Sequence, residues 1–293
     1  MTEDERYAVT AIAFVGSVFS SRYAMARRRG PADPMDFCAL NVVVYGPERK
    51  LWTLTEWPRR AVFQRTDHFQ LGPNLLRWHG DTLELRFDER TAPFGDPLRG
   101  TIRLHPEALF DFTLELDEPG RHRWRPIAPI ARVEVELTEP ALRFAGHGYH
   151  DHNWGDEPLE EAFHSWNWSR ARLPRGAAIL YDAKRKVGGD RSWGGLFRAD
   201  GTVGDLEAPR HCPLPTGLWG VERATRTDGQ GDARIVRNLE TSPFYERALL
   251  RTHLAGHASI AVHEALSCDR FGRLWVQLLL PFRTRSRSPR WQW

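Results

Sequence analysis

Residues 132–137, Arg-Val-Glu-Val-Glu-Leu, alternate charged and apolar side chains without a break. A period of two is typical of a β-strand that has one buried and one solvated face. The same alternation occurs in residues 83–88 and 110–116, and no long stretch has the spacing of an amphipathic helix. The sequence therefore predicts an all-β protein made of antiparallel strands.

The second half of the chain continues this pattern. Further strands are expected at residues 177–183, 192–198, 217–226, 235–240, 259–266 and 274–282. Turn sequences such as Gly72-Pro73-Asn74 separate the strands at intervals that suit a meander. A strand-rich chain of this length predicts two barrels or sandwiches. Leu173-Pro174-Arg175-Gly176 is the candidate boundary, giving domains 1–172 and 173–293.

Charge and cysteine content narrow the class of protein. The 41 Lys+Arg against 38 Asp+Glu give a net charge of +3, too balanced for a protein that binds nucleic acid by neutralising phosphates. The three cysteines are widely spaced and form no CxxC pair, which favours a reducing compartment. The acidic N-terminus is unlike a signal peptide, and no apolar run reaches the roughly 20 residues of a membrane helix. We expect a cytoplasmic protein.

Two basic segments qualify this expectation. Residues 27–29 are three arginines, and the tail 283–293 combines arginines with Trp291 and Trp293. Cationic and indole side chains together suit anionic headgroups and the membrane interface. The tail is therefore either solvated or a peripheral contact with the inner or intracytoplasmic membrane.

Residues 148–155, Gly-Tyr-His-Asp-His-Asn-Trp-Gly, gather the densest set of candidate functional groups. Rings of this size are costly to expose, so they should line a core or a ligand pocket. His150 and His152 share one face of the predicted strand, but no third ligand stands at a usable spacing, and we expect no metal. The candidate binding residues here and eleven residues later are Tyr149, Asn153, Trp154, Trp166 and Trp168, and Glu264 in the second half of the chain joins them.

Two acids fall on apolar faces of predicted strands. Asp182 shares its face with Ala178 and Leu180, and Glu264 shares its face with Val262 and Leu266. A carboxyl in that position is either ion-paired or kept protonated, and burial raises its pKa toward that of a proton donor at neutral pH. Arg247, Arg251 and Arg270 are alternative ion-pair partners for Glu264. No phosphate-binding or serine-nucleophile motif is present, so no cofactor is predicted.

Segments spread along the chain resemble the carotenoid 1,2-hydratases, also called hydroxyneurosporene synthases. The resemblance runs in order from about residue 11 to 283, through residues 12–20, 38–42, 124–126, 146–155 with Trp166 and Trp168, 181–183, 263–267 and 275–282. It implies two lipocalin-like β-barrels. It also implies a cofactor-independent hydratase that adds water across the terminal C1=C2 bond of acyclic carotenoids such as neurosporene and lycopene.

The residues suit a reaction through a carbocation, because aromatic faces attract cations. Our first choice of proton donor is Asp182, supported by Tyr181, and the rival is Asp151. His152, with Asp151, would position or deprotonate the water, although the two lie on opposite faces of one strand. The tryptophans would shield the cation and line an apolar tunnel. Alternative functions are a polyene cyclase on the same scaffold and a lipocalin-like pigment carrier.

Overall fold

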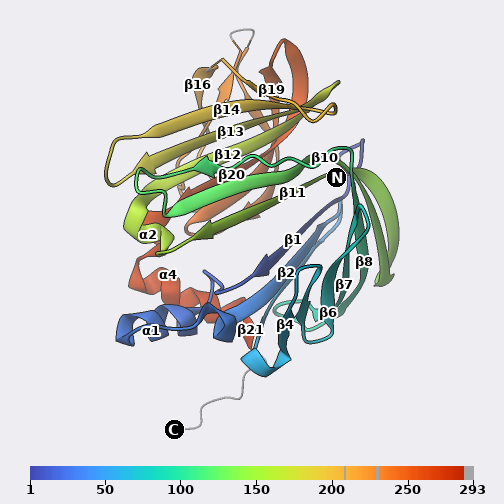
Figure 1. Ribbon diagram of the computed structural model, residues 1–293, viewed down its shortest axis with the longest axis vertical. Coiled ribbons are helices and arrows are strands. Elements are labelled where there is room, and N and C mark those ends of the chain that lie inside the picture. Colours follow the sequence, from blue (N-terminus) through green and yellow to red (C-terminus); the bar gives the residue numbers. More distant parts are fainter. Residues whose placement is uncertain (208, 229–230, 287–293) are drawn as a thin grey trace. The chain divides into compact units, whose positions relative to one another are not determined.

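The computed structural model describes residues 1–207, 209–228 and 231–286, and antiparallel strands dominate it (Figure 1). This confirms the all-β prediction. The basic tail beyond Ser286 lies outside the described residues. No helix in the described part of the chain has the length and apolarity to cross a membrane.

The strands of unit 1, defined below, are β1 (Ala8–Phe14), β2 (Cys38–Tyr45), β3 (Lys50–Trp57), β4 (Val62–Gln64), β5 (His68–Leu71), β6 (Asn74–His79), β7 (Thr82–Arg90), β8 (Pro97–Pro106) and β21 (Arg285–Ser286). Those of unit 2 are β9 (Leu114–Glu115), β12 (Phe163–Leu173), β13 (Gly176–Arg185), β14 (Arg191–Arg198), β15 (Val203–Asp205), β16 (Arg210–Leu214), β17 (Arg223–Thr227), β18 (Arg234–Thr241), β19 (Tyr245–Leu254) and β20 (His257–Ser267). Both units share β10 (His122–Glu139) and β11 (Ala141–Gly155). The helices are α1 (Ser21–Arg29), α2 (Leu159–Ala162), α3 (Cys268–Phe271) and α4 (Leu274–Leu279), with 3₁₀ turns η1 (Pro34–Phe37), η2 (Arg59–Ala61) and η3 (Leu280–Phe282).

The chain divides into two compact units, each made of several segments. Unit 1 comprises residues 1–106 and 131–148 and the chain from residue 277 onward, and unit 2 comprises residues 107–130 and 149–276. The long strands β10 and β11 pass from one unit to the other. The candidate boundary between residues 172 and 173 lies inside unit 2, at the end of β12.

Unit 1 is built on β2, which is buried along its whole length. Its sequence, CALNVVVY, is almost continuously apolar, as expected for a strand covered on both faces. β2 pairs with β1 and β3, and β21 completes this sheet. A second sheet has the order β11-β10-β8-β7-β6-β5-β4, and its apolar face packs with β2 in one core. Val133, Val135 and Leu137 of the opening stretch belong to that core.

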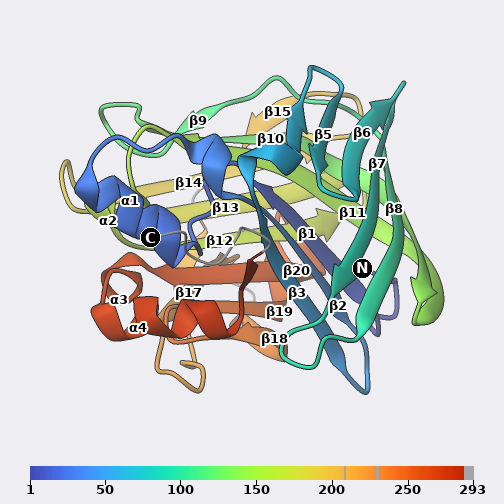
Figure 2. The same ribbon diagram turned by 90° about the horizontal axis from the view of Figure 1, so that it is seen from below.

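Unit 2 contains a seven-stranded sheet with the order β15-β14-β13-β12-β20-β19-β18, seen in Figure 2 from a second direction. Leu180 and Leu250 on one face pack with Cys212 and Leu214 of the β16–β17 hairpin. The three cysteines are free and buried. The opposite face of this sheet carries the residues described in the next section.

Residues 274–282 form α4 and η3, so the strand expected there was wrong. An apolar run this short does not distinguish a buried strand from a helix by its periodicity. The burial of Val276 and Leu280, four residues apart, is the helical spacing.

Two other expected strands are shorter than predicted. Only Leu114 and Glu115 of residues 110–116 form a strand, because Phe110 and Phe112 pack on aromatic rings of β14 instead. Only Arg223 onward of residues 217–226 is extended, because a turn closed by the Gly220 to Gly217 hydrogen bond precedes it. The helix α1 was not predicted; it is capped by the Ser20 side chain and buries none of its residues.

Candidate active site

A row of five side chains crosses the seven-stranded sheet of unit 2 on one face. Arg247 on β19 pairs in register with Glu264 on β20, and Glu264 with Trp168 on β12. Trp168 in turn pairs with Tyr181 on β13, and Tyr181 with Trp193 on β14. Residues paired in register lie side by side on the same face of a sheet. The strand register therefore assembles an aromatic surface from residues far apart in the sequence.

The first residues of β10 and the last residues of β11 lie against this surface, within the same unit. The Trp124 ring lies 5.7 Å from the rings of both Tyr181 and Trp193, measured between centroids. The Tyr149 ring lies 5.1 Å from that of Trp168. Trp124 is completely buried. These contacts place the carboxyl group of β11 among aromatic rings.

That carboxyl belongs to Asp151, and its hydrogen-bond donors are uncharged. The Trp124 indole Nε1–H donates to Asp151 Oδ2 at 2.8 Å and lies 3.2 Å from the Tyr149 hydroxyl oxygen. Asn153 Nδ2 donates to the same Oδ2 at 3.3 Å, and the Tyr149 hydroxyl also bonds to the carboxyl. Tyr149, Asp151 and Asn153 thus lie on one face of β11, as the strand alternation predicted.

Burial raises the pKa of Asp151 from its ordinary value of 3.8 to about 6. The hydrogen bonds from Trp124, Tyr149 and Asn153 act in the opposite direction, because they stabilise the carboxylate, and the negative charge of Glu264 raises the pKa further. A carboxyl with this pKa is available in its protonated form near neutral pH, as a general acid requires.

Two further residues hold β10 and the rings in place. The buried Arg170 donates from Nε and an Nη atom to the Pro129 carbonyl oxygen at 3.0 and 2.8 Å, which ties β12 to β10. Trp166 lies next to Tyr181, with ring centroids 6.3 Å apart. Trp168 is buried, and its indole N–H has no hydrogen-bond partner among the described residues.

His152 and Trp154 lie apart from the Asp151 carboxyl. Their rings stack on each other, with centroids 4.9 Å apart, and His152 is exposed. Partial desolvation by its neighbours and the charge of Arg125 lower the pKa of His152. The structure does not bring His152 to Asp151, and the water-positioning role expected for it has no geometric support.

Asp182 lies on the other face of β13 from Tyr181. Its carboxylate pairs with the Arg226 guanidinium, at 2.8 Å from one Nη atom and 2.9 Å from Nε. The Asp182 carboxylate is thus engaged in an ion pair on the face of the sheet away from the aromatic row. We therefore revise the first choice of proton donor from Asp182 to Asp151.

Glu264 takes the ion-pair alternative that the sequence left open. Arg247 contacts Glu264 Oε1 from Nε at 2.8 Å and from an Nη atom at 2.7 Å. Glu264 is therefore a charged neighbour of the Trp168 ring and no candidate donor.

Three residues of the site were missed from the sequence: Trp124, Trp193 and Arg170. Trp124 stood in a segment already singled out, but only the fold shows that its N–H reaches Asp151.

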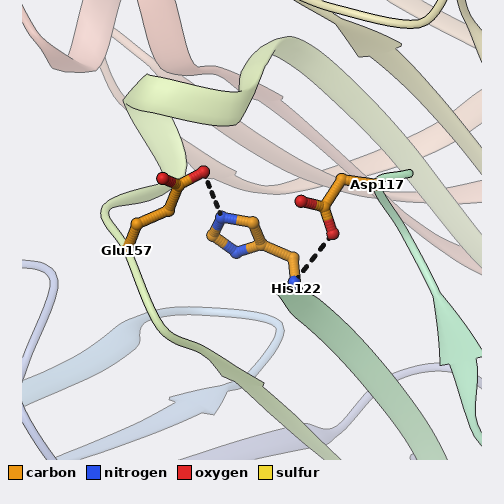
Figure 3. Close-up of side chains that lie close together, drawn as sticks. All are labelled: Asp117, His122 and Glu157. Carbon is orange, nitrogen blue, oxygen red and sulfur yellow. Dashed lines mark hydrogen bonds and ion pairs between the residues drawn. The ribbon is translucent and has the colours of Figure 1, made fainter. Parts of the chain in front are cut away.

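A second polar group lies nearby on β10 and the loops of unit 2 (Figure 3). His122 stands between the carboxylates of Asp117 and Glu157, and the three possible ligand atoms lie within 4.8 Å of one another. These donor types could hold a divalent metal. Arg121, however, pairs with Glu157 at 2.7 Å and lies 3.8 Å from Asp117, so both carboxylates already face a cation. We interpret this group as a charge network that fastens the end of β11 to the start of β10.

Known proteins share this architecture and sequence. A family model described as the carotenoid hydratase CrtC matches residues 11–293. An acyclic carotenoid 1,2-hydratase of Thiocapsa roseopersicina is 47% identical over 284 residues, covering 97% of this chain and 70% of that protein. The enzyme of the same name from Cereibacter sphaeroides is 37% identical and covers 96% of this chain and 99% of its own.

A solved structure of a putative AttH from Nitrosomonas europaea superposes with a TM-score of 0.60 at 12% identity, covering 78% of this chain and 80% of that one. At this identity the likeness concerns the fold alone, and it agrees with the prediction of lipocalin-like β domains. The match of the family model over nearly the whole sequence is the decisive finding. This chain belongs to the CrtC family of carotenoid hydratases.

Proposed function

We propose that this protein hydrates the terminal C1=C2 double bond of acyclic carotenoids and that Asp151 is the proton donor. One observation carries the assignment: an acid with uncharged hydrogen-bond donors and a raised pKa lies among aromatic rings. The names of its relatives supply the substrate class.

The first step is a proton transfer. The C1=C2 π electrons take the proton from the Asp151 carboxyl to form a C–H bond at C2, leaving a carboxylate and a cation at C1. C1 is the tertiary carbon, so the more stable cation forms there. The Trp168, Tyr181 and Trp193 rings stabilise it, and a desolvated cation–π contact is worth about 2 kcal/mol. The Trp124 N–H stabilises the Asp151 carboxylate as it forms.

The second step adds water. A water oxygen bonds to C1, and the resulting oxonium returns one proton to the Asp151 carboxylate, which regenerates the acid. The cycle consumes one water molecule and returns the proton to Asp151, so the reaction needs no cofactor. We expect the purified protein to keep its activity after treatment with a metal chelator.

Product analysis in deuterated water tests this proposal. Lycopene incubated with the protein should gain one molecule of water and carry deuterium at C2. The rate should fall as pH rises above about 6, because Asp151 must be protonated to react. A product of unchanged mass would identify a cyclase, and a hydrated product without deuterium at C2 would reject protonation by an exchangeable acid.

The substrate also suggests where the protein works. Acyclic carotenoids are long hydrocarbons that reside in lipid, so we expect peripheral association with a membrane surface. The basic tail remains one candidate contact, and its residues 287–293 lie outside the described part of the chain.

A further inference from the structure

We infer that the 217–220 loop and the helix α4 beside it form a lipid-binding surface that docks the protein on an anionic phospholipid bilayer. The inference deepens the proposed function, since a lipid-dissolved substrate requires such a surface. These residues take no part in the proposed active site.

Large apolar side chains are exposed on both segments. Leu218 is 85% exposed and Leu274 is 66% exposed, and both belong to unit 2. The Trp219 and Trp275 rings, also partly exposed, lie 6.5 Å apart between centroids, which shows that the loop and the start of α4 are neighbours. Exposed apolar groups that gather in this way mark an interaction site.

The exposed apolar residues continue along α4, which is labelled in Figure 2. Leu278, four residues after Leu274 on the same helix, is 63% exposed. Val276 and Leu280 are buried on the other side of the same run. The run is therefore amphipathic, and its outward stripe is apolar rather than polar.

Hydrogen bonds and packing hold the loop tip outward. Arg270 donates from its two Nη atoms to the carbonyl oxygens of Trp219, at 2.5 Å, and Gly220, at 3.2 Å. At the other end of the loop, a Cβ on Gly217 would meet the buried Glu246 carboxylate, so a larger residue there would have to displace that side chain. Leu218 and Trp219 therefore lie on a turn that is already held in place. Little conformational entropy is lost when their side chains enter a lipid bilayer.

Charge and ring chemistry indicate a bilayer as the occupant. The sequence from residue 269 to 286 contains four arginines and one acid, and Arg273 is exposed next to Leu274. Arginines near a surface favour anionic headgroups, and tryptophans favour the level of the headgroups. The exposed leucines beside them would enter the boundary with the acyl chains, as in peripheral helices that lie in the interface.

Vesicle sedimentation of the full chain without substrate tests this surface. The vesicles are phosphatidylcholine alone or an equal mixture with phosphatidylglycerol. The double variant Leu274→Glu with Leu278→Glu should bind mixed vesicles at least roughly tenfold more weakly, because charges replace two exposed leucines that would enter the bilayer. Leu109→Glu, which alters a leucine 56% exposed elsewhere in unit 2, should bind as the unchanged protein does. Arg273→Gln should weaken binding to the mixed vesicles only.

Several outcomes decide the matter. Undiminished sedimentation of the double variant would overturn the inference. The inference would also be overturned if the unchanged protein forms a dimer that the double substitution dissociates while vesicle binding is kept. The apolar face would then be the contact between two copies of the chain. If the double variant does not fold, judged by circular dichroism, Leu218→Glu alone replaces it. Hydration of detergent-dissolved lycopene is measured in parallel: its loss in every sample refutes the proposed function but leaves the surface intact.

Discussion

Asp151 and Asp182 are two acids of the same unit in opposite electrostatic settings. Asp151 receives hydrogen bonds from an indole, a phenol and an amide, whereas Asp182 is held by the Arg226 guanidinium. Uncharged donors compensate only part of the cost of burying a carboxylate, while a guanidinium compensates it with a full charge. The contrast teaches that the identity of the partner, more than proximity to aromatic rings, decides which acid can deliver a proton.

The largest expected effect is that of Asp151→Asn. The amide keeps the shape of the side chain but has no acidic proton, so hydration should fall about 10²–10⁴-fold. Chromatography of products from lycopene measures this loss, and circular dichroism checks the fold. Near-normal hydration by the folded variant would remove Asp151 from the mechanism.

Asp151→Asn should also change the pH dependence of the unfolding free energy. A carboxyl whose folded pKa is raised from 3.8 to about 6 stabilises the fold in its protonated form, and this contribution is lost as pH rises through 6. Asp151→Asn has no such loss. Its stability relative to the unchanged protein, measured by urea unfolding, should therefore increase between about pH 4 and 6; a decrease in this window would contradict the raised pKa.

Trp124→Phe should shift the pH dependence of hydration. The ring remains, but the indole N–H that stabilises the Asp151 carboxylate is lost, so the pKa of Asp151 rises. A hydrogen bond to a charged group is worth about 1.5–3 kcal/mol, which corresponds to a shift of about one to two pH units. The alkaline limb of the rate profile should move upward by that amount. A limb that stays or moves downward would show that Trp124 does not act on this acid.

Asp182→Asn should act on stability rather than chemistry. Removing one partner leaves the half-buried Arg226 without its ion pair, so we expect a loss of about 1–3 kcal/mol of unfolding free energy. Activity per folded molecule should stay within about twofold, because this carboxylate does not face the aromatic row. Arg226→Gln is the matched control and should resemble it. If Asp182→Asn abolishes hydration in folded protein while Arg226→Gln does not, Asp182 is the donor after all.

The smallest effect is expected for His152→Ala. Its exposed ring contacts Trp154 and lies away from the Asp151 carboxyl, so hydration should change by less than about twofold. The rate with saturating lycopene in detergent measures this. A drop approaching that of Asp151→Asn would restore the role in positioning water that the sequence suggested.

Much of the fold could be predicted because a strand with one buried face alternates apolar and polar residues in the sequence. The alternation in residues 132–137 predicted the strand that contributes Val133, Val135 and Leu137 to the core of unit 1. Residues 274–282 led to a wrong prediction because a short, mostly apolar run fits strand and helix equally well. The sequence also does not show that each unit is built from several segments. The residue pattern of a long strand such as β10 does not change where the strand passes from one unit to the other.

The sequence by itself determined the fold class, the family, and the face of β11 that groups Tyr149, Asp151 and Asn153. These depend on residue order and on the alternation of one strand, which are local properties. Only the tertiary structure decided which acid is suited to donate a proton. Strand register brings Trp168, Tyr181 and Trp193 together, and contacts between distant segments give Asp151 an indole and Asp182 a guanidinium. A pKa depends on everything within a few ångströms, and those neighbours come from parts of the chain that only folding brings together.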